Sequence, residues 1–136
     1  MKTPRHTHRF RRGFTLLEMT IVIMVLIALI STGLFVTRRM DDWRLGREAS
    51  ETLRQVYSAQ RMFLADNPTR LVSSIVANDV VPYLPSGATT LPTVKSLTNT
   101  NLSIIVNVSP PVINAGSGVV YDPSGSNRDS LWDVGE

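Results

Sequence analysis

The chain of 136 residues contains no cysteine, and its only histidines, His6 and His8, lie near the N-terminus. Without cysteine there is no disulfide, no thiol nucleophile and no thiolate ligand for zinc. We interpret the two histidines as ordinary polar residues rather than as metal ligands or members of a catalytic triad. Glycine-rich phosphate-binding loops are also absent, and no pair of carboxylates is placed for acid–base chemistry. The sequence therefore predicts that the protein is not an enzyme.

Charge and proline are missing from one long stretch, residues 14–36, in which Glu18 is the only ionisable group. As an α-helix this stretch would span about 35 Å, and the hydrocarbon core of a bilayer is about 30 Å thick. Apolar side chains occur on every side of such a helix, so it is not a surface amphipathic helix. We therefore predict one transmembrane helix.

Basic residues flank this stretch unequally, because five precede it and two, Arg38 and Arg39, follow it. The more basic flank stays cytoplasmic, so the N-terminus is expected inside the cell and the remaining chain outside. A cleaved secretory signal peptide is the alternative. Its apolar core is about 7–15 residues long and ends at a small-x-small site, which Ala28, Ser31 and Gly33 match poorly. The five preceding basic residues are Lys2, Arg5, Arg9, Arg11 and Arg12.

Glu18 lies one helical turn inside the apolar stretch. A carboxylate in lipid costs of order 2–3 kcal/mol, and less near the headgroups. Either its side chain reaches the headgroups or it pairs with a cation. Cutting the chain between Gly13 and Phe14 would create an α-amine four residues away that is largely charged at neutral pH. In a bundle of identical helices, Glu18 of one subunit would pair strongly with Phe14 of a neighbour, because the dielectric constant there is low.

The segment Gly13-Phe14-Thr15-Leu16-Leu17-Glu18, behind a basic leader and ahead of an apolar stretch, resembles the class III signal of type IV pilins and type II secretion pseudopilins. The resemblance covers about residues 9–36. It implies cleavage after Gly13 by a prepilin peptidase, N-methylation of Phe14, and pairing of Glu18 with a neighbouring Phe14 amine during filament assembly. Many members carry a proline in this helix, whereas here Ser31-Thr32-Gly33 is the only place where the helix is expected to loosen.

The resemblance also divides the chain into a cleaved leader (1–13), a transmembrane and assembly helix (14–37), and an amphipathic helix with a small periplasmic head (38–136). Removing the leader leaves nine basic and eleven acidic residues, so the high pI does not predict nucleic-acid binding. The expected partners are identical or different pilin-like subunits, the prepilin peptidase, the inner-membrane assembly platform and, before assembly, membrane lipid. The lack of cysteine favours the pseudopilins, because many pilus-forming members close a C-terminal loop with a disulfide.

Helical periodicity continues beyond residue 36, with apolar residues at three- and four-residue spacing until Asn67-Pro68 ends the pattern. The predicted fold class is α+β. One long helix over residues 14–66 has an apolar transmembrane half and an amphipathic half. The amphipathic half packs against a small head that contains a short antiparallel sheet. A coiled-coil dimer is the alternative cover for the amphipathic half, but the pattern is not heptad. The apolar residues are Leu45, Ala49, Leu53, Val56, Phe63 and Leu64.

The C-terminal part is expected to supply the sheet. Ser73 or Ser74 is predicted to cap a short helix that ends before Pro82, and residues 82–92 are predicted to form a loop. Residues 102–108 and 118–121 are predicted as strands joined through a turn at 114–117. Leu131 and Trp132 are expected to return to the helix.

Asp122, Asp129, Asp133 and Glu136, with serine and asparagine between them, offer oxygen ligands for calcium, and major pseudopilins have a C-terminal calcium loop. The spacing matches no fixed calcium motif, and solvated acidic residues are the alternative. The sequence as a whole predicts a structural subunit of a type IV pilus-like filament, most of all a type II secretion pseudopilin, first in the bacterial inner membrane and then in a periplasmic or cell-surface filament. A signal-anchored periplasmic binding module that is neither processed nor polymerised is the alternative.

Overall fold

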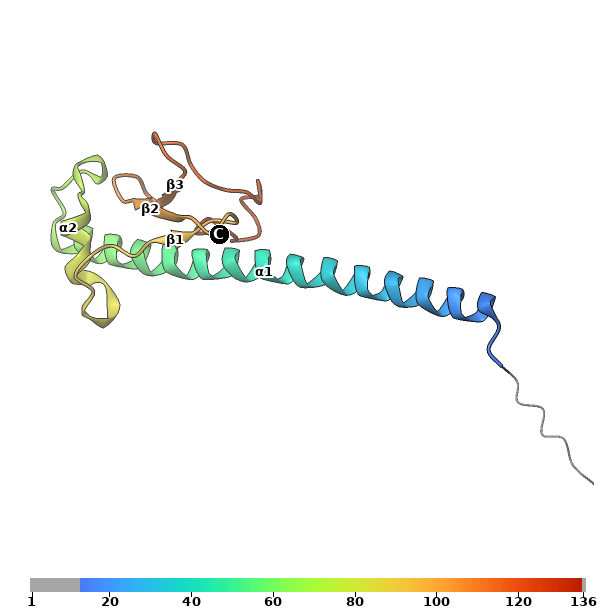
Figure 1. Ribbon diagram of the computed structural model, residues 1–136. Helices are drawn as coiled ribbons and strands as arrows, with labels where there is room; N and C mark the ends of the chain where they lie inside the picture. Colours follow the sequence, from blue (N-terminus) through green and yellow to red (C-terminus); the bar gives the residue numbers. More distant parts are fainter. Residues whose placement is uncertain (1–12, 136) are drawn as a thin grey trace, which may run out of the picture. The chain divides into compact units, whose positions relative to one another are not determined.

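The structure is a computed structural model that describes residues 13–135, so the basic residues of the leader, both histidines and Glu136 lie outside the described residues. The chain forms two compact units, Met1–Arg38 and Arg39–Glu136. One long helix, three short strands and several short helical turns make up the described part (Figure 1). The α+β class predicted from the sequence is confirmed.

Helix α1 (Leu16–Asp66) has 51 residues, and its first part belongs to the first unit. Large apolar side chains there are exposed on every side, and an 18-residue window with a mean hydropathy of 2.7 has none of its residues buried. The described residues thus contain one helix, near the N-terminus, that is long and apolar enough to cross a membrane.

The hydroxyl groups in this part of α1 do not interrupt it. Ser31, Thr32 and Thr37 each donate a hydrogen bond to the carbonyl oxygen four residues earlier, at 2.8–3.0 Å. These bonds satisfy the hydroxyls without a partner outside the helix, so polar side chains are tolerated in an apolar segment. The helix runs unbroken through Gly33 in the single chain, and loosening there within a filament stays a prediction.

In the second unit, the rest of α1 is the core of the head. Residues at three- and four-residue spacing are buried along one side, which confirms the periodicity predicted for the amphipathic half. Leu53, Val56 and Ala59 are fully buried, while Leu45 and Leu64 are partly buried at the margin of the core. The buried residues of α1 are Gly46, Ala49, Ser50, Leu53, Val56, Ala59, Gln60 and Phe63.

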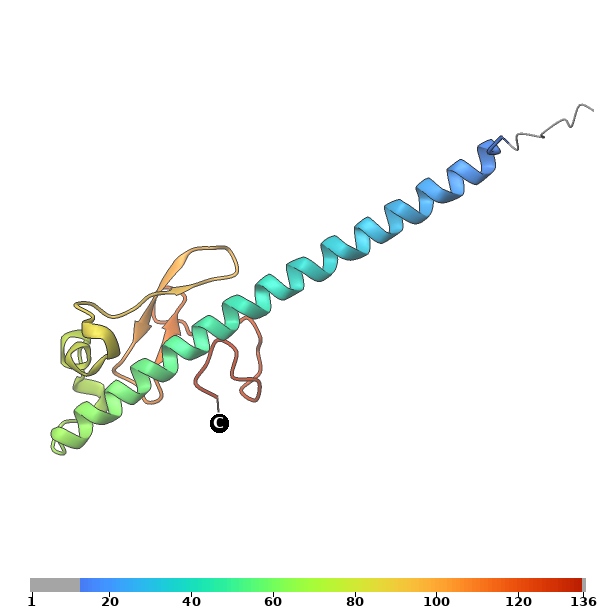
Figure 2. The same ribbon diagram turned by 90° about the horizontal axis from the view of Figure 1, so that it is seen from below.

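Strands β1 (Val94–Lys95), β2 (Asn101–Ile105) and β3 (Val112–Asn114) form an antiparallel sheet in the order β1-β2-β3. Val94 lies opposite Leu102, and Ile104 lies opposite Ile113. Both views show the sheet beside the second part of α1, where Val94, Ile104 and Ile113 are buried in the core (Figure 2). The head thus covers the amphipathic half of the helix with its own chain.

The segment predicted as a strand at 118–121 forms a single antiparallel bridge, between Val120 and Asn114, flanked by hydrogen bonds from Ala115 N–H to Val119 O at 2.7 Å and from Tyr121 N–H to Ile113 O at 2.9 Å. The preceding turn explains the difference. The Asn114 side-chain oxygen accepts hydrogen bonds from the backbone of Gly116 and Gly118, and the backbone is left-handed from Gly116 to Gly118. The left-handed residues of this turn limit the pairing beside β3 to one bridge, and Val119 and Val120 remain exposed.

Short helical segments connect α1 to β1: the 3₁₀ turns η1 (Val72–Ser74), η2 (Val81–Tyr83) and η3 (Pro85–Gly87), and the one-turn helix α2 (Ala77–Val80). A serine cap was predicted here and was wrong. Val76 precedes α2, and the Asp79 carboxylate accepts its backbone N–H at 3.1 Å. An acidic residue in the first turn therefore stabilises the start of α2.

The C-terminal segment returns to α1, as predicted. Leu131 and Trp132 pack against Gly46, where an added Cβ would lie 3.0 Å from Trp132 Nε1. The Trp132 ring is buried and meets Tyr121 edge-on, with 5.3 Å between ring centroids. Gly46 therefore permits a close approach that a side chain would obstruct, although glycine costs helix stability.

Gln60 joins α1 to the chain that leaves β2. Its Nε2 atom donates to the carbonyl oxygens of Val106 at 2.8 Å and Val108 at 2.7 Å. Both carbonyls lie beyond the end of β2, where the sheet no longer supplies donors. A fully buried glutamine is therefore required at this position, although the sequence pattern alone did not reveal it.

Candidate functional site

The start of α1 is organised by Thr15. Its hydroxyl oxygen accepts the backbone N–H of Glu18 at 3.2 Å, and its carbonyl oxygen accepts the N–H of Met19. This is the arrangement of an N-cap residue, with glutamate at the third helical position. The Thr-x-x-Glu pattern in the sequence predicts such a cap at Thr15, although the resemblance assigns this residue no role.

Glu18 lies in the first turn of α1, where the helix dipole favours a negative charge. Its neighbours on the helix are apolar and exposed: Leu16 by 85%, Leu17 by 68% and Met19 by 49%. A carboxylate surrounded by such side chains gains most from a cationic partner when lipid or another helix excludes water.

The three residues singled out for processing and assembly lie together. Gly13, Phe14, Thr15 and Glu18 line an open hollow of about 500 Å³. Phe14 is 74% exposed, and no basic side chain within residues 13–135 pairs with Glu18. The surface around the peptide bond between Gly13 and Phe14 is therefore open, and Glu18 has room for a cation from another molecule.

The acidic C-terminal loop is held by its own side chains. One oxygen of Asp122 accepts the backbone N–H groups of Ser124 at 3.1 Å and Gly125 at 3.2 Å, and the Ser124 hydroxyl at 2.6 Å. Asp129 accepts the backbone N–H of Leu131 at 3.0 Å. These two carboxylates therefore shape the turns that bring Leu131 to the helix.

Asp133 lies at the margin of the core, and one of its oxygens is buried without a hydrogen-bond partner within the described residues. Burial raises the pKa of Asp133, and the nearby carboxylates of Asp122 and Asp129 raise it further. The three aspartates are thus close enough to repel one another. No three histidine, cysteine or acidic side chains between residues 13 and 135 are close enough to share a metal ion, and the calcium site stays a prediction.

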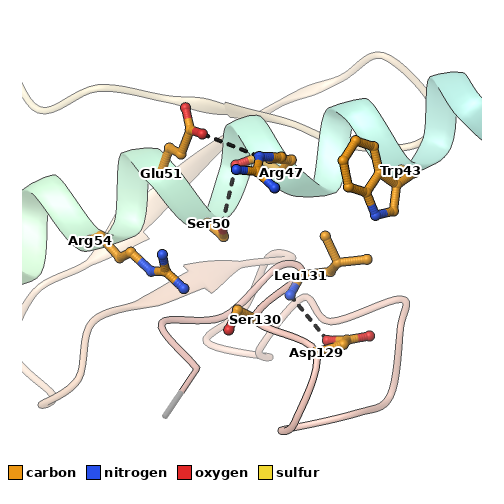
Figure 3. Close-up of a pocket in the computed structure, with 8 residues that line it drawn as sticks. All are labelled: Trp43, Arg47, Ser50, Glu51, Arg54, Asp129, Ser130 and Leu131. Carbon is orange, nitrogen blue, oxygen red and sulfur yellow. Dashed lines mark hydrogen bonds and ion pairs between the residues drawn. The ribbon is translucent and has the colours of Figure 1, made fainter.

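A polar hollow of about 260 Å³ lies between the outer side of α1 and the C-terminal loop (Figure 3). Arg47 and Glu51 form an ion pair at 3.5 Å, and Arg54 points toward the loop that carries Asp129 and Ser130. The hollow is open and bordered by exposed charged side chains. These features fit a contact surface better than an enclosed ligand pocket.

Comparison of the chain with protein-family models, with curated proteins and with solved structures finds no match.

Proposed function

We propose that this chain is a structural subunit of a type IV pilus-like filament, most of all a type II secretion pseudopilin, which is cleaved after Gly13 and assembles through the first part of α1. The proposal rests above all on the combination of the Gly13-Phe14 junction, the carboxylate of Glu18 four residues later, and the exposed apolar helix that follows.

The apolar surface of the first unit and the separate core of the second unit support the proposal. The core of the head lies within residues 49–132, whereas the apolar side chains of residues 14–36 are exposed. Before assembly, lipid would cover this apolar surface in the bacterial inner membrane, with the head in the periplasm. In the filament, the helices of neighbouring subunits would replace the lipid.

Glu18 has two roles in this proposal. In the membrane, its position near the helix start limits the cost of a carboxylate in the apolar segment. In the filament, it pairs with the methylated amine of Phe14 from a neighbouring subunit, which sets the position of one helix relative to the next. The prepilin peptidase and the inner-membrane assembly platform are the partners of these two stages.

The experiment compares Glu18→Ala, Glu18→Gln and Thr15→Ala in the full chain. We expect the two Glu18 variants to enter the membrane normally but to reduce filament yield at least about tenfold, because loss of one partner of a desolvated ion pair costs several kcal/mol. Thr15→Ala removes the cap without removing the charge, so it controls for helix fraying and should retain most assembly. Normal filament yield from Glu18→Gln would contradict the assigned role.

The alternative is a signal-anchored periplasmic binding module. It predicts that the leader remains attached and that loss of the Glu18 charge has no effect on association. A hollow of about 380 Å³ on the head is lined by Trp43, Leu97, Pro123 and Trp132 together with Arg39 and Asp42, but it is open at the surface. Filament formation and the N-terminal residue of the purified chain separate the two functions.

A further inference from the structure

The charged residues of α1 follow an order that the proposed function does not explain by itself. Four of its acidic residues lie four positions after a cation, if the Phe14 nitrogen freed by cleavage is counted. No acidic residue of α1 is followed by a cation of the helix four positions later. The four pairs are Phe14 and Glu18, Arg38 and Asp42, Arg44 and Glu48, and Arg47 and Glu51.

Stability of the single helix does not account for this order. Within a helix, a glutamate placed four residues before a cation stabilises more than the reverse arrangement, because of the helix dipole. Arg44–Glu48 at 3.3 Å and Arg47–Glu51 at 3.5 Å both have the weaker arrangement, and all four side chains are 59–78% exposed. Such exposed pairs contribute little to folding.

These two pairs lie on the side of α1 opposite its buried residues, where Glu48 is near Lys95 of β1 and where Arg47 and Glu51 border the hollow beside the C-terminal loop. Glu51 is two residues from the fully buried Leu53, and two residues turn a helix by about 200°, so the two side chains point in nearly opposite directions. Trp43, at the edge of this side toward the C-terminal segment, is 55% exposed, and the Arg47 guanidinium lies 5.5 Å from the centre of its ring; Met62, farther along the helix, is 46% exposed. Figure 3 shows Trp43, Arg47 and Glu51 along this side of the helix.

We infer that this outer face of α1, formed by Trp43, Arg44, Arg47, Glu48, Glu51 and Met62, binds a second copy of the chain, parallel to the first and shifted by four residues. The inference rests on the proposed function, because two copies anchored in one membrane are parallel and the Glu18–Phe14 pair requires the same four-residue shift. Four residues correspond to about 6 Å along a helix.

In this register the carboxylates of one copy meet the arginines of the next. Glu48 faces Arg44 of the second copy and Glu51 faces its Arg47, as Glu18 faces the Phe14 nitrogen. Arginine suits this exchange because its guanidinium binds a carboxylate with two hydrogen bonds and keeps stacking on an aromatic ring. The Trp43 ring lies against Arg47 and reduces its contact with water, which strengthens the pair that Arg47 makes. The four-residue shift that pairs Glu18 with the Phe14 nitrogen therefore also pairs carboxylates and arginines in the head.

A charge swap separates pairing within one copy from pairing between copies. The swapped chain carries Arg44→Glu, Glu48→Arg, Arg47→Glu and Glu51→Arg, so every pair is kept within the chain and also between two swapped chains. Between a wild-type and a swapped chain, glutamate would face glutamate and arginine would face arginine. Full-length chains with two different tags are expressed together, and filaments sheared from the cells are purified on one tag and probed for the other.

We expect wild-type and swapped chains each to form filaments alone, and the incorporation of one into filaments of the other to fall about tenfold, because like charges at an interface discriminate strongly against the wrong partner. Differently tagged wild-type chains give the reference value. Arg70→Gln removes an exposed charge beyond the C-terminal end of α1 and should mix freely with wild-type. Thermal unfolding in detergent verifies that each head is folded.

Free mixing of wild-type and swapped chains would overturn the inference while leaving the filament function intact. A swapped chain that is folded but forms no filaments alone would overturn it as well, because its pairs between copies are complementary. Failure of the wild-type chain itself to form filaments would refute the proposed function instead.

Discussion

The two parts of α1 differ in what covers them. Large apolar side chains of residues 14–36 are 48–85% exposed, whereas Leu53 and Val56 are fully buried beneath the head. One continuous helix therefore has an apolar surface that its own chain leaves open and an amphipathic surface that its own chain closes. An exposed apolar surface of this extent marks a contact with lipid or protein. The second part of α1 thus contributes to the core of the head, whereas the first part presents an apolar surface to its surroundings.

The largest effect on stability is expected from the matched pair Leu53→Ala and Leu29→Ala. Leu53 is fully buried, so its truncation should destabilise the head by about 2–5 kcal/mol. Leu29 is 64% exposed, and its truncation should leave the unfolding temperature of the head unchanged. Circular dichroism of the full chains in detergent measures both. Equal effects of the two variants would contradict the division of α1 into an open and a covered part.

The covered part was the more predictable of the two from its own sequence. Leu53, Val56 and Phe63 recur at helical spacing, and only a helix buries such a set on one side. The return of Leu131 and Trp132 was also predicted, because large apolar residues in a polar tail need a partner. For the first part, the apolar stretch predicted the helix, but the proposed processing and assembly involve molecules outside this chain, which its own structure cannot contain.

The sheet was harder to predict because its strands are short. β1 has two residues and β3 has three, too few to show alternation, and β3 directly follows Pro110 and Pro111. Residues 118–121 were predicted as a strand because Val119 and Val120 are β-branched, but beside the turn at Asn114 they form only one bridge to β3. The need for Gln60 arises only where β2 ends beside α1, a contact between distant segments.

A smaller loss of stability is expected from Gly46→Leu, which tests whether the C-terminal segment packs against the covered part of α1. A side chain at this position would collide with Leu131 and Trp132, so we expect about 1–3 kcal/mol of destabilisation despite the better helix propensity of leucine. Gly33→Leu is the matched control, because nothing lies within 4 Å of a Cβ added there. An unfolding temperature for Gly46→Leu at or above that of wild-type would show that the C-terminal segment is not held against α1.

The smallest effect concerns Asp133, at the margin of the covered part. Its pKa is raised by burial and by neighbouring carboxylates, so the folded head holds the proton more tightly than the unfolded chain does. The stability of the head should therefore fall as the pH rises from about 3.9, the unfolded value, through the raised pKa. Asp133→Asn should raise the unfolding temperature by a few degrees at pH 7 and not at pH 3. Measurement in the presence of a chelator prevents calcium from neutralising the three carboxylates. A lower unfolding temperature for Asp133→Asn at pH 7 would contradict this account.

The central claim is that the open part of α1 begins at a freed Phe14 nitrogen, which pairs with Glu18 of another copy. The most direct test is the intact mass and the N-terminal residue of the chain purified from membranes of cells that carry the assembly machinery. We predict a chain that lacks residues 1–13 and begins with N-methylated Phe14. A chain that keeps its leader and still occurs in filaments would contradict the claim.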